Sequence, residues 1–316
     1  MRRCLVTGAN GFIGSHLVES LAADASNQVY AIFHATQENI AHLKNRVSLH
    51  SVDLLERSQL SKVLIKCQAT HVFHLAAASN VAQSWSNPDL YFRVNVNATA
   101  NLLESTRKAD LDPTMMVVCS GAEYGVGSSE PLTEESPLNP ASPYAVSKVA
   151  QDMLAGLYAK AYGMKIVRVR PFLVIGPRRL TGACADFGRG IARIEVGLQD
   201  HLQVGNLSPI IDVLDVRDAV EGFKVVTDRG VGGDIYNLAS GRGYSVRQLL
   251  DMLIGLARTR IDVSVDPKKF RPLDETILIG DNSKLRRLGW HPTIPIEASL
   301  KDVLDFWRTR IRQSSG

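Results

Sequence analysis

The first 175 residues alternate short apolar, β-branched runs with stretches whose apolar residues recur at helical spacing. The strand-like runs are 4–7, 29–33, 47–52, 72–75, 115–119 and 165–169. The helix-like stretches are 12–22, 58–67, 95–109 and 144–162. Apolar strands that alternate with helices are typical of a parallel sheet covered on both faces. With right-handed crossovers, the pattern predicts an α/β fold of the Rossmann type, a doubly wound parallel sheet.

Beyond residue 177 the alternation loosens, and helical stretches are separated by short strands and proline-containing loops. The expected helices are 187–198, 216–227, 245–256 and 300–312. We expect this region to form a smaller lobe over the carboxyl edge of the sheet, where such folds bind ligands. The sheet domain would then comprise residues 1–175, and the chain would return to it around 209–240. The remaining segments, 176–208 and 241–316, would form the substrate-binding lobe.

Composition and charge mainly exclude other classes of protein. The chain has 316 residues, of which 45% are hydrophobic and 22% charged, which is typical of a globular protein rather than a disordered one. Its net charge of +4, from 36 basic and 32 acidic residues, does not require a nucleic-acid partner. The apolar runs are far shorter than the roughly 18 residues that a membrane span needs, so we expect no membrane partner.

The N-terminus and the cysteines indicate the compartment. The chain reaches Gly8 before an apolar signal region can form, which predicts a cytoplasmic location. The cysteines are widely scattered, with no CxxC pair and no close Cys/His cluster. We therefore expect buried free thiols in a reducing compartment and no metal site. These cysteines are Cys4, Cys67, Cys119 and Cys184.

Glycines at three-residue spacing follow the first strand and open the first helix, in the segment 7–14 with the sequence TGANGFIG. A tight turn needs glycine, and glycine lets the backbone approach a pyrophosphate closely. The free N–H groups and the positive dipole end of the helix then face the phosphates. The residues expected to bind the pyrophosphate of a dinucleotide are Gly8, Asn10, Gly11, Phe12, Ile13 and Gly14.

Positions after the next strands also fit a dinucleotide. Asp53, with Leu54 beside it, follows the third strand, where a carboxylate can accept from an adenine amino group. The run Leu75-Ala76-Ala77 follows the fourth strand and would let the backbone lie against the cofactor. The second strand ends at His34, whereas NAD-preferring chains often carry an acidic residue there to hold the ribose 2′-hydroxyl. Since His34 does not repel a 2′-phosphate, we expect NADP or NAD and favour NADP.

Tyr144 and Lys148 lie four residues apart at the start of a predicted helix, which places them on one face. Ser120 follows the strand at 115–119. This set suits hydride transfer coupled to proton transfer at a carbonyl or alcohol, in which the tyrosine exchanges the proton and the serine holds the substrate oxygen. A tyrosine pKa of about 10 is too high for this at neutral pH. We expect Lys148 and an oxidised nicotinamide to lower the pKa of Tyr144 by favouring its phenolate.

In combination these motifs resemble the extended short-chain dehydrogenase/reductases, the NAD-dependent epimerase/dehydratase family. The resemblance extends over nearly the whole chain and rests on the segments 7–14, 53–54, 74–77, 144–148 and 170–177. It implies a nicotinamide cofactor in the N-terminal domain, which Tyr144, Lys148 and Pro171 would also contact. It further implies a nucleotide sugar in the C-terminal lobe.

The resemblance also implies how the chain assembles. Members of the family pair through two helices, which in this sequence would be those near 96–108 and 145–162. A homodimer held by a four-helix bundle is therefore expected. Apolar residues at helical spacing in the first of these helices fit that role.

The C-terminal tail is similar to the GDP-mannose 4,6-dehydratase branch of the family and to the neighbouring GDP-4-keto-6-deoxy-D-mannose reductases. The similar segments are 204–207, 266–274, 278–285 and 288–292. In that branch an arginine like Arg271 contacts the diphosphate and an acidic residue like Asp274 contacts the ribose, roles that suit guanidinium and carboxylate groups. The resemblance places Val204 and Ser79 at the substrate as well.

The loop at 119–125, with the sequence CSGAEYG, separates the activities within that branch. Dehydratases remove water across C5–C6 of the sugar, and the family places a glutamate for this step two residues before the tyrosine of the Tyr-Gly pair. This chain has Ala122 there, and alanine cannot move a proton. Glu123 is one residue later and would point to the other side of an extended chain. We nevertheless include Glu123, with Ser120, among the expected substrate contacts.

Two positions depart from the family pattern. Leu173 replaces an asparagine that contacts substrate, and Ile211 replaces an arginine that binds phosphate. Losing an amide and a guanidinium should weaken phosphate binding by roughly a few kcal/mol unless other groups replace them. Arg178 or Arg179 could be such a replacement. A different substrate is the other explanation.

The sequence thus predicts an NAD(P)-dependent oxidoreductase that reduces the 4-keto group of a nucleotide-activated 6-deoxy-hexulose, with GDP-4-keto-6-deoxy-D-mannose favoured. Ser120, Tyr144 and Lys148 are the expected catalytic residues. The alternative is a nucleotide-sugar 4-epimerase of the UDP-glucose 4-epimerase kind with retained NAD. A GDP-mannose 4,6-dehydratase and a non-catalytic cofactor-binding protein are less favoured.

Overall fold

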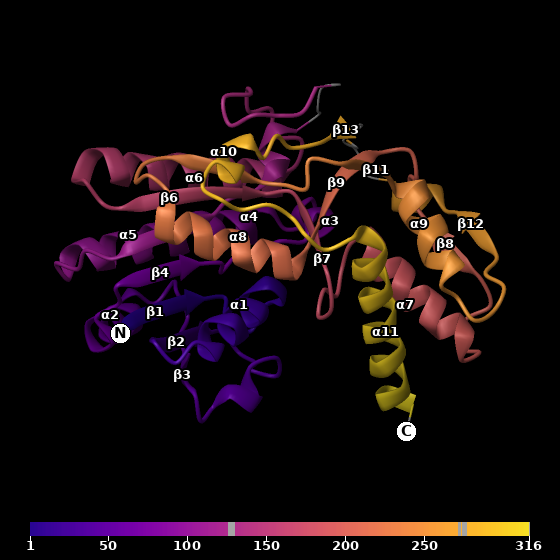
Figure 1. Cartoon of the computed structure of the whole chain (residues 1–316), viewed down its shortest axis with the longest axis horizontal. Coiled ribbons are helices and arrows are strands. Elements are labelled where there is room, and N and C mark those ends of the chain that lie inside the picture. The colour runs from indigo at the N-terminus through magenta and orange to yellow at the C-terminus, as the bar shows by residue number, and fades with distance from the viewer. Residues whose placement is uncertain (126–129, 271–272, 274–276, 316) are drawn as a thin grey trace.

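A seven-stranded sheet forms the larger part of the molecule (Figure 1). The computed structural model describes residues 1–125, 130–270, 273 and 277–315. The strand order is β3-β2-β1-β4-β5-β6-β10, and every neighbouring pair is parallel. The strands are β1 (Arg2–Thr7), β2 (Asn27–Phe33), β3 (Val47–Ser51), β4 (His71–His74), β5 (Thr114–Val118), β6 (Ile166–Pro171) and β10 (Ile235–Leu238). The doubly wound α/β fold predicted from the sequence is confirmed.

Helices cover both faces of this sheet. They are α1 (Phe12–Ala23), α2 (Arg57–Cys67), α5 (Ala98–Lys108), α6 (Pro143–Tyr162) and α8 (Val216–Arg229). Helices α1 and α8 pack on one face, where Leu17 and Phe223 are fully buried. Helices α2, α5 and α6 pack on the other face, around Leu64 and Leu102. Each buried side chain of this size contributes roughly 1.5–3 kcal/mol, so the apolar runs seen in the sequence stabilise both layers.

The strand order reverses between β1 and β4. From β1 the chain builds β2 and β3 on one side, and it later returns beside β1 to build β4, β5 and β6 on the other. The segments that follow β1 and β4 therefore meet at the carboxyl edge of the sheet. Parallel sheets bind ligands at such a reversal. The glycine turn at 8–14 and the run at 75–77 both lie there.

A smaller lobe follows β6, and its helices α7, α9 and α11 lie together at one side of the molecule, away from α2 and α5 (Figure 1). Its main sheet has the order β11-β9-β13, β7 also pairs with β9, and β8 pairs with β12. Ile191, Leu250 and Leu300 are fully buried in its core. The elements are β7 (Leu173–Ile175), α7 (Ala183–Glu195), β8 (Leu202–Val204), β9 (Ile210–Asp215), β11 (Gly243–Ser245), α9 (Val246–Gly255), β12 (Val263–Val265), β13 (Ile277–Leu278) and α11 (Ile296–Ser315).

The boundary between sheet domain and lobe differs from the expected one. The sequence places 173–175 and 210–215 in the sheet domain, whereas β7 and β9 pair with each other in the smaller sheet. The chain rejoins the large sheet through α8 and β10. A short apolar run has the same pattern in either sheet, so only the pairing partner decides. The division into two domains itself stays a prediction.

Short helical segments connect these elements. They are α3 (Val81–Ser84), α4 (Pro88–Tyr91) and α10 (Ser283–Arg286). The helix predicted at 95–109 begins as a π-helical turn, η2 (Phe92–Asn97), and continues as α5. Such turns are rare and occur frequently at functional sites.

The cysteines are free and buried, as the sequence predicts. Their burial follows from their positions in or beside the apolar runs of the sheet and helices. In the part of the chain that the structure describes, no helix is both long and apolar enough to cross a membrane.

His74, the last residue of β4, joins two strands and a helix inside the core. Its Nδ1 lies 2.7 Å from the hydroxyl of Thr7, and its Nε2 lies 2.8 Å from the hydroxyl of Thr99. The side chain is fully buried, and this burial lowers the pKa of His74 to about 3, with a smaller contribution from the charge of Lys148. The folded protein therefore keeps this imidazole neutral.

The neutral state of His74 makes stability depend on pH. Between the ordinary histidine pKa of about 6.5 and the lowered value, the unfolded chain binds a proton that the folded chain does not. We expect His74 to remove about 1.4 kcal/mol of unfolding free energy per pH unit as the pH falls from 6 to 4. Urea unfolding of wild type and of His74→Gln, a polar and uncharged replacement, measures this. The two stabilities should converge as the pH falls, and parallel curves would contradict the expectation.

Candidate active site

The glycine turn lies between β1 and α1. Gly8 has a φ of 68°, and a Cβ on it would lie 2.7 Å from the backbone nitrogen of Ala76. A Cβ on Gly14 would lie 2.1 Å from the carbonyl oxygen of Gly8. Both positions therefore require glycine, because the turn packs directly against the start of α1 and the segment after β4. The cradle that a Cβ would fill, at the N-terminus of α1, fits the pyrophosphate of a dinucleotide.

Asn10 fastens this turn to the loop after β2. Its Oδ1 accepts a hydrogen bond from the backbone N–H of Asn39 at 2.9 Å, and its Nδ2 donates to the hydroxyl of Thr36 at 3.0 Å. Phe12 lies on the other side of the turn, with the guanidinium of Arg179 5.8 Å from its ring centroid. The turn is thus held from both lobes of the molecule.

The ends of β2 and β3 bring His34 and Asp53 together. Both side chains are exposed, and His34 Nε2 lies 4.0 Å from Asp53 Oδ2. Asp53 Oδ1 accepts from the backbone N–H of Leu55 at 2.9 Å, which holds the carboxylate at the edge of the sheet. The side chains of Leu54 and Ile13 pack against the hydrophobic core, so a cofactor would meet mainly their backbones.

The segment after β4 is held in place by Asn95, a residue that sequence reasoning missed. Asn95 lies in the π-helical turn η2 and is fully buried. Its amide accepts from the backbone N–H of Ala78 at 2.8 Å and donates to the carbonyl of Ala78 at 3.1 Å and to the hydroxyl of Ser147 at 2.9 Å. These bonds tie the segment to α6. The sequence offered one indication of this role, an asparagine within a stretch whose apolar residues recur at helical spacing.

Ser120 begins a short 3₁₀ helix, η3 (Gly121–Tyr124), directly after β5. Its hydroxyl accepts from the backbone N–H of Ala122 at 3.2 Å, and its own N–H donates to Glu123 Oε1 at 2.7 Å. The two bonds form a capping box. The segment is therefore not extended, and Glu123 is turned into the interior, where it is completely buried. The expectation that Glu123 contacts substrate is not supported by this position.

Helix α6 presents Tyr144 and Lys148 one turn apart, after Ser142 caps its first turn and Pro143 occupies the next position. Lys148 is 2% exposed, and its Nζ donates to the carbonyl oxygen of Val118 at 2.5 Å and to Gln151. Burial lowers the pKa of Lys148. Tyr144 packs edge-on against the ring of Tyr91.

The hydroxyl of Ser120 lies near enough to the phenol of Tyr144 to act on its pKa. Burial raises the pKa of Tyr144 to about 12, while the Ser120 hydroxyl opposes the rise and the charge of Glu123 adds to it. Tyr144 is therefore a protonated phenol at neutral pH. The expectation that Lys148 and an oxidised nicotinamide together lower the pKa of Tyr144 concerns the complex with the cofactor and stays a prediction.

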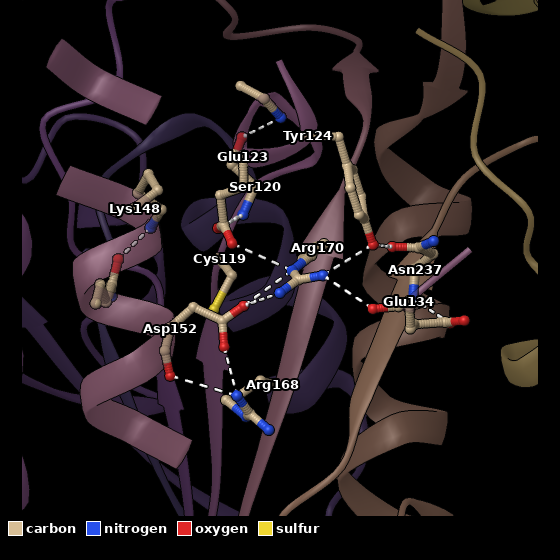
Figure 2. Close-up of polar contacts among 12 residues, drawn as sticks. Cys119, Ser120, Glu123, Tyr124, Glu134, Lys148, Asp152, Arg168, Arg170 and Asn237 are labelled. Carbon is tan, nitrogen blue, oxygen red and sulfur yellow. Dashed lines mark hydrogen bonds and ion pairs between the residues drawn. The ribbon is translucent and has the colours of Figure 1, made fainter. Parts of the chain in front are cut away.

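Beneath Ser120, the guanidinium of Arg170 binds two buried carboxylates (Figure 2). Its Nε lies 3.1 Å from Glu123 Oε2, and its Nη2 lies 2.7 Å from Asp152 Oδ2. Its Nη1 donates to the hydroxyl of Tyr124 at 2.9 Å. Asp152 Oδ1 accepts from Arg168 Nη1 at 2.7 Å. The cluster joins β6, η3 and α6.

Sequence reasoning missed the roles of Asp152 and Arg168 in this cluster. The signal was present, because a strand predicted to be buried contains arginine and the apolar face of the helix at 144–162 contains an aspartate. The ligand atoms of Cys119, Glu123 and Asp152 lie within 4.8 Å of one another. Arg170 already pairs with both carboxylates, so the donor set suits a guanidinium rather than a metal ion.

The arginines expected at the substrate phosphates are engaged within the protein. Arg178 donates to the hydroxyl of Ser15 at 3.1 Å and to Glu19 Oε1 at 2.6 Å, which turns it toward α1. Arg179 donates to the carbonyl oxygen of Val174 at 2.6 Å and lies near Tyr144, whose pKa it helps to lower. Of the two, Arg179 is the one placed beside the catalytic residues.

The other expected substrate and cofactor contacts are distributed around the site. Ser79 is exposed beyond the end of β4, and Pro171 is half-buried at the carboxyl end of β6. Val204 is 1% exposed in the core of the lobe, so its side chain is not available to a substrate, a correction to the expectation. Arg271 and Asp274 lie outside the described residues.

Known proteins resemble this chain in sequence and in fold. The sequence profile of the GDP-mannose 4,6 dehydratase family matches residues 5–303. GDP-6-deoxy-D-mannose reductase of Pseudomonas aeruginosa is 30% identical over 317 aligned residues, which cover 99% of each chain.

Two solved structures extend this comparison to the fold. The structure of RMD from Pseudomonas aeruginosa complexed with NADPH is 29% identical, with a TM-score of 0.85 over 98% of this chain and 100% of that one. UDP-glucose 4-epimerase of Thermus thermophilus, in complex with NAD, is 30% identical, with a TM-score of 0.87 over 98% of this chain and 99% of that one. The likeness thus covers both lobes. With its profile match over nearly the whole sequence, the chain belongs to the GDP-mannose 4,6 dehydratase family, as the motifs of its sequence predicted.

Proposed function

We propose that the protein is an NAD(P)H-dependent reductase of the 4-keto group of a GDP-activated 6-deoxy-hexulose, with GDP-4-keto-6-deoxy-D-mannose as its substrate. The observation that carries the proposal is that Ser120, at the start of η3, and Tyr144 and Lys148, on α6, come together at one place, with alanine at position 122. The similarity to the reductase of Pseudomonas aeruginosa supports it.

The site residues divide the work of a carbonyl reduction. When bound, the reduced nicotinamide supplies a hydride to C4 of the sugar. Tyr144 gives its phenolic proton to the oxygen on C4, and the hydroxyl of Ser120 holds that oxygen by a hydrogen bond. Tyr144 carries its proton at neutral pH, as the acid of this reaction must before the hydride is transferred. Lys148, held by the carbonyl oxygen of Val118, stabilises the phenolate that results.

The loop around Ala122 argues against dehydration. A 4,6-dehydration needs an additional acid or base near C5 and C6 of the sugar, and a methyl group cannot serve. Glu123 cannot take this role from its position, because both its oxygens are bound in the interior, to Ser120 and to Arg170. Chemistry confined to C4 is what the remaining groups support.

A 4-epimerase is the second candidate function. The similarity to UDP-glucose 4-epimerase of Thermus thermophilus, at a TM-score of 0.87, favours it. An epimerase uses the same residues but recovers its cofactor in each turnover, whereas a reductase consumes one NAD(P)H for each sugar.

For the cofactor, NADP is favoured over NAD. The residues directly after β2 are His34, Ala35 and Thr36 rather than a carboxylate, so a 2′-phosphate would not be repelled at the end of this strand. Asp53, at 4.0 Å from His34, is placed for the adenine side of the pocket. Phosphate groups of the substrate would be held by Arg179 and, from the tail, by Arg271.

The activity proposal predicts a substrate-dependent consumption of cofactor. GDP-mannose, a 4,6-dehydratase and excess NADPH are supplied, and oxidation of NADPH is followed. We expect Tyr144→Phe to lower kcat by about 10²–10⁴-fold, because the phenol is the proton donor. Its affinity for NADPH, measured by fluorescence, should stay close to that of wild type.

Tyr158→Phe is the matched control, since Tyr158 lies on the same helix and its hydroxyl contacts Glu104 rather than the site. It should retain full activity. Absence of keto-sugar-dependent oxidation in the wild type, with NAD released on denaturation, would contradict the reductase and favour the epimerase.

The outer face of α6 supports a homodimer. Met153, Leu157 and Tyr162 are 66%, 58% and 54% exposed, and Val146 is exposed on the same helix. Large apolar side chains gathered in this way mark an interaction surface. We propose that α5 and α6 pair with the same helices of a second copy, as a four-helix bundle formed by 96–108 and 145–162.

Charge on this face should separate the subunits. We expect the double variant Met153→Asp, Leu157→Asp to be a monomer in light scattering after size exclusion, because it would bury four carboxylates in the dimer. Ile65→Asp is the matched control: Ile65 is 57% exposed on α2, outside the proposed interface, and the variant should stay dimeric. A monomeric wild type, or a double variant that remains dimeric, would contradict the proposal.

A further inference from the structure

Two segments carry the catalytic residues, and they come from different parts of the chain. Ser120 begins η3 after β5, whereas Tyr144 and Lys148 lie on α6. Catalysis requires that the hydroxyl of Ser120 and the phenol of Tyr144 converge on one oxygen atom. A displacement of about 1 Å between such groups can cost about 10²-fold in rate.

Glu123 reaches both the Ser120 turn and the cluster beneath it (Figure 2). Its Oε1 accepts from the N–H of Ser120 at 2.7 Å, and its Oε2 lies 3.1 Å from Nε of Arg170. Its two oxygens are therefore committed to two different donors. Glu123 and Arg170 are 0% and 3% exposed, so water does not compete for these bonds.

Asp152 makes the matching connection on the helix. It lies on α6 one turn beyond Lys148 and two turns beyond Tyr144, and it is 1% exposed. Its Oδ2 lies 2.9 Å from Nε and 2.7 Å from Nη2 of Arg170, while its Oδ1 accepts from Arg168 at 2.7 Å. The same guanidinium is thus bound by the Ser120 turn through Glu123 and by the catalytic helix through Asp152.

We propose that Glu123 and Asp152 are positioning residues of the reaction, which act through Arg170 to hold Ser120 at a fixed place relative to Tyr144 and Lys148. Neither carboxylate faces the substrate. Their part is to join η3 and α6 by a path of charged hydrogen bonds that does not pass through the substrate site.

The energetics favour geometry over stability as the role of this cluster. Buried ion pairs are offset by the desolvation of their charges, and apolar replacements of the whole set are often no less stable. Burial and the neighbouring charge of Asp152 raise the pKa of Glu123, while the guanidinium of Arg170 opposes the rise and favours the carboxylate. If one partner moved away, a buried charge would be left without compensation. The three charged groups are therefore held in one arrangement.

The turn η3 also contacts β10, through the hydroxyl of Tyr124. Tyr124 donates its hydroxyl to Oδ1 of Asn237 at 2.7 Å, and Glu134 accepts from the N–H of Asn237 at 2.8 Å. The bonds to Asn237 tie η3 to β10, although the hydroxyl of Tyr124 also accepts from Arg170. Glu134 therefore provides a half-buried, hydrogen-bonded carboxylate on the other side of the cluster, and its replacement leaves the path from Ser120 to α6 intact.

Glu123→Gln and Asp152→Asn test the inference, which rests on the proposed reductase function. An amide has one acceptor oxygen where each of these carboxylates uses two, so one donor loses its partner in either variant. We expect each to lower kcat for the keto-sugar by about 10²-fold while the affinity for NADPH is unchanged. Glu134→Gln is the control and should retain kcat.

A double-mutant cycle separates positioning from general damage. If Glu123 acts by placing Ser120, Glu123→Gln should cause little further loss in a Ser120→Ala background. Asp152→Asn should likewise cause little further loss of kcat in the Ser120→Ala background. This second cycle tests the inference if Glu123→Gln does not fold. Full additivity in both cycles, or a kcat equal to that of wild type, would overturn the inference.

Amide hydrogen exchange gives a readout that needs no substrate. Segments 119–125 and 143–152 should exchange faster in both variants and not in Glu134→Gln, because the path between them is broken. If the wild type does not reduce the keto-sugar, the proposed function fails, and exchange alone decides the inference. Unchanged exchange in both segments would overturn it.

Discussion

The active site depends on one buried guanidinium. Arg170 lies between the carboxylates of Glu123 and Asp152, and these belong to the turn that begins with Ser120 and to the helix that carries Tyr144. A buried charge that loses its partner destabilises a protein by about 3–5 kcal/mol, so neither segment can move away from Arg170 freely. An interaction that adds little net stability can in this way impose a precise geometry on groups it does not touch.

The surrounding fold places this cluster at the edge of the sheet where the glycine turn lies. The reversal of strand order between β1 and β4 brings the glycine turn against Ala76, where the turn has no room for a Cβ. The π-helical turn η2 then lets Asn95 hold Ala78 against α6. A dinucleotide site and a proton-transfer site therefore share one edge of the sheet, which is the arrangement that hydride transfer needs.

The short turn after β5 bears on the proposed chemistry. Its 3₁₀ geometry directs Glu123 inward and leaves alanine at position 122. Tyr144 is a protonated phenol at neutral pH, and burial raises its pKa further, so it holds a proton that the proposed reaction can give to a carbonyl oxygen. These features agree with a reaction confined to C4 of the sugar, and they depend on how the turn is folded as much as on which residues it contains.

The sequence by itself determined the parallel sheet, the glycine turn and the spacing of Tyr144 and Lys148, because periodicity, turn chemistry and positions one helical turn apart are local properties of the chain. Tertiary structure alone decided that β7 and β9 pair in the smaller sheet and that Val204 is buried in the lobe. A short apolar run has the same appearance in either sheet.

The same limit applies to the charged residues. Arg178 is turned toward α1 by Glu19, and Glu123 is joined to Asp152 through Arg170, although these partners are far apart in the sequence. Local sequence identifies which residues can be charged or reactive. Long-range packing decides how close these residues come to one another and how much water surrounds them. The distance between two charges and their exposure to water set the strength of each electrostatic interaction in the site.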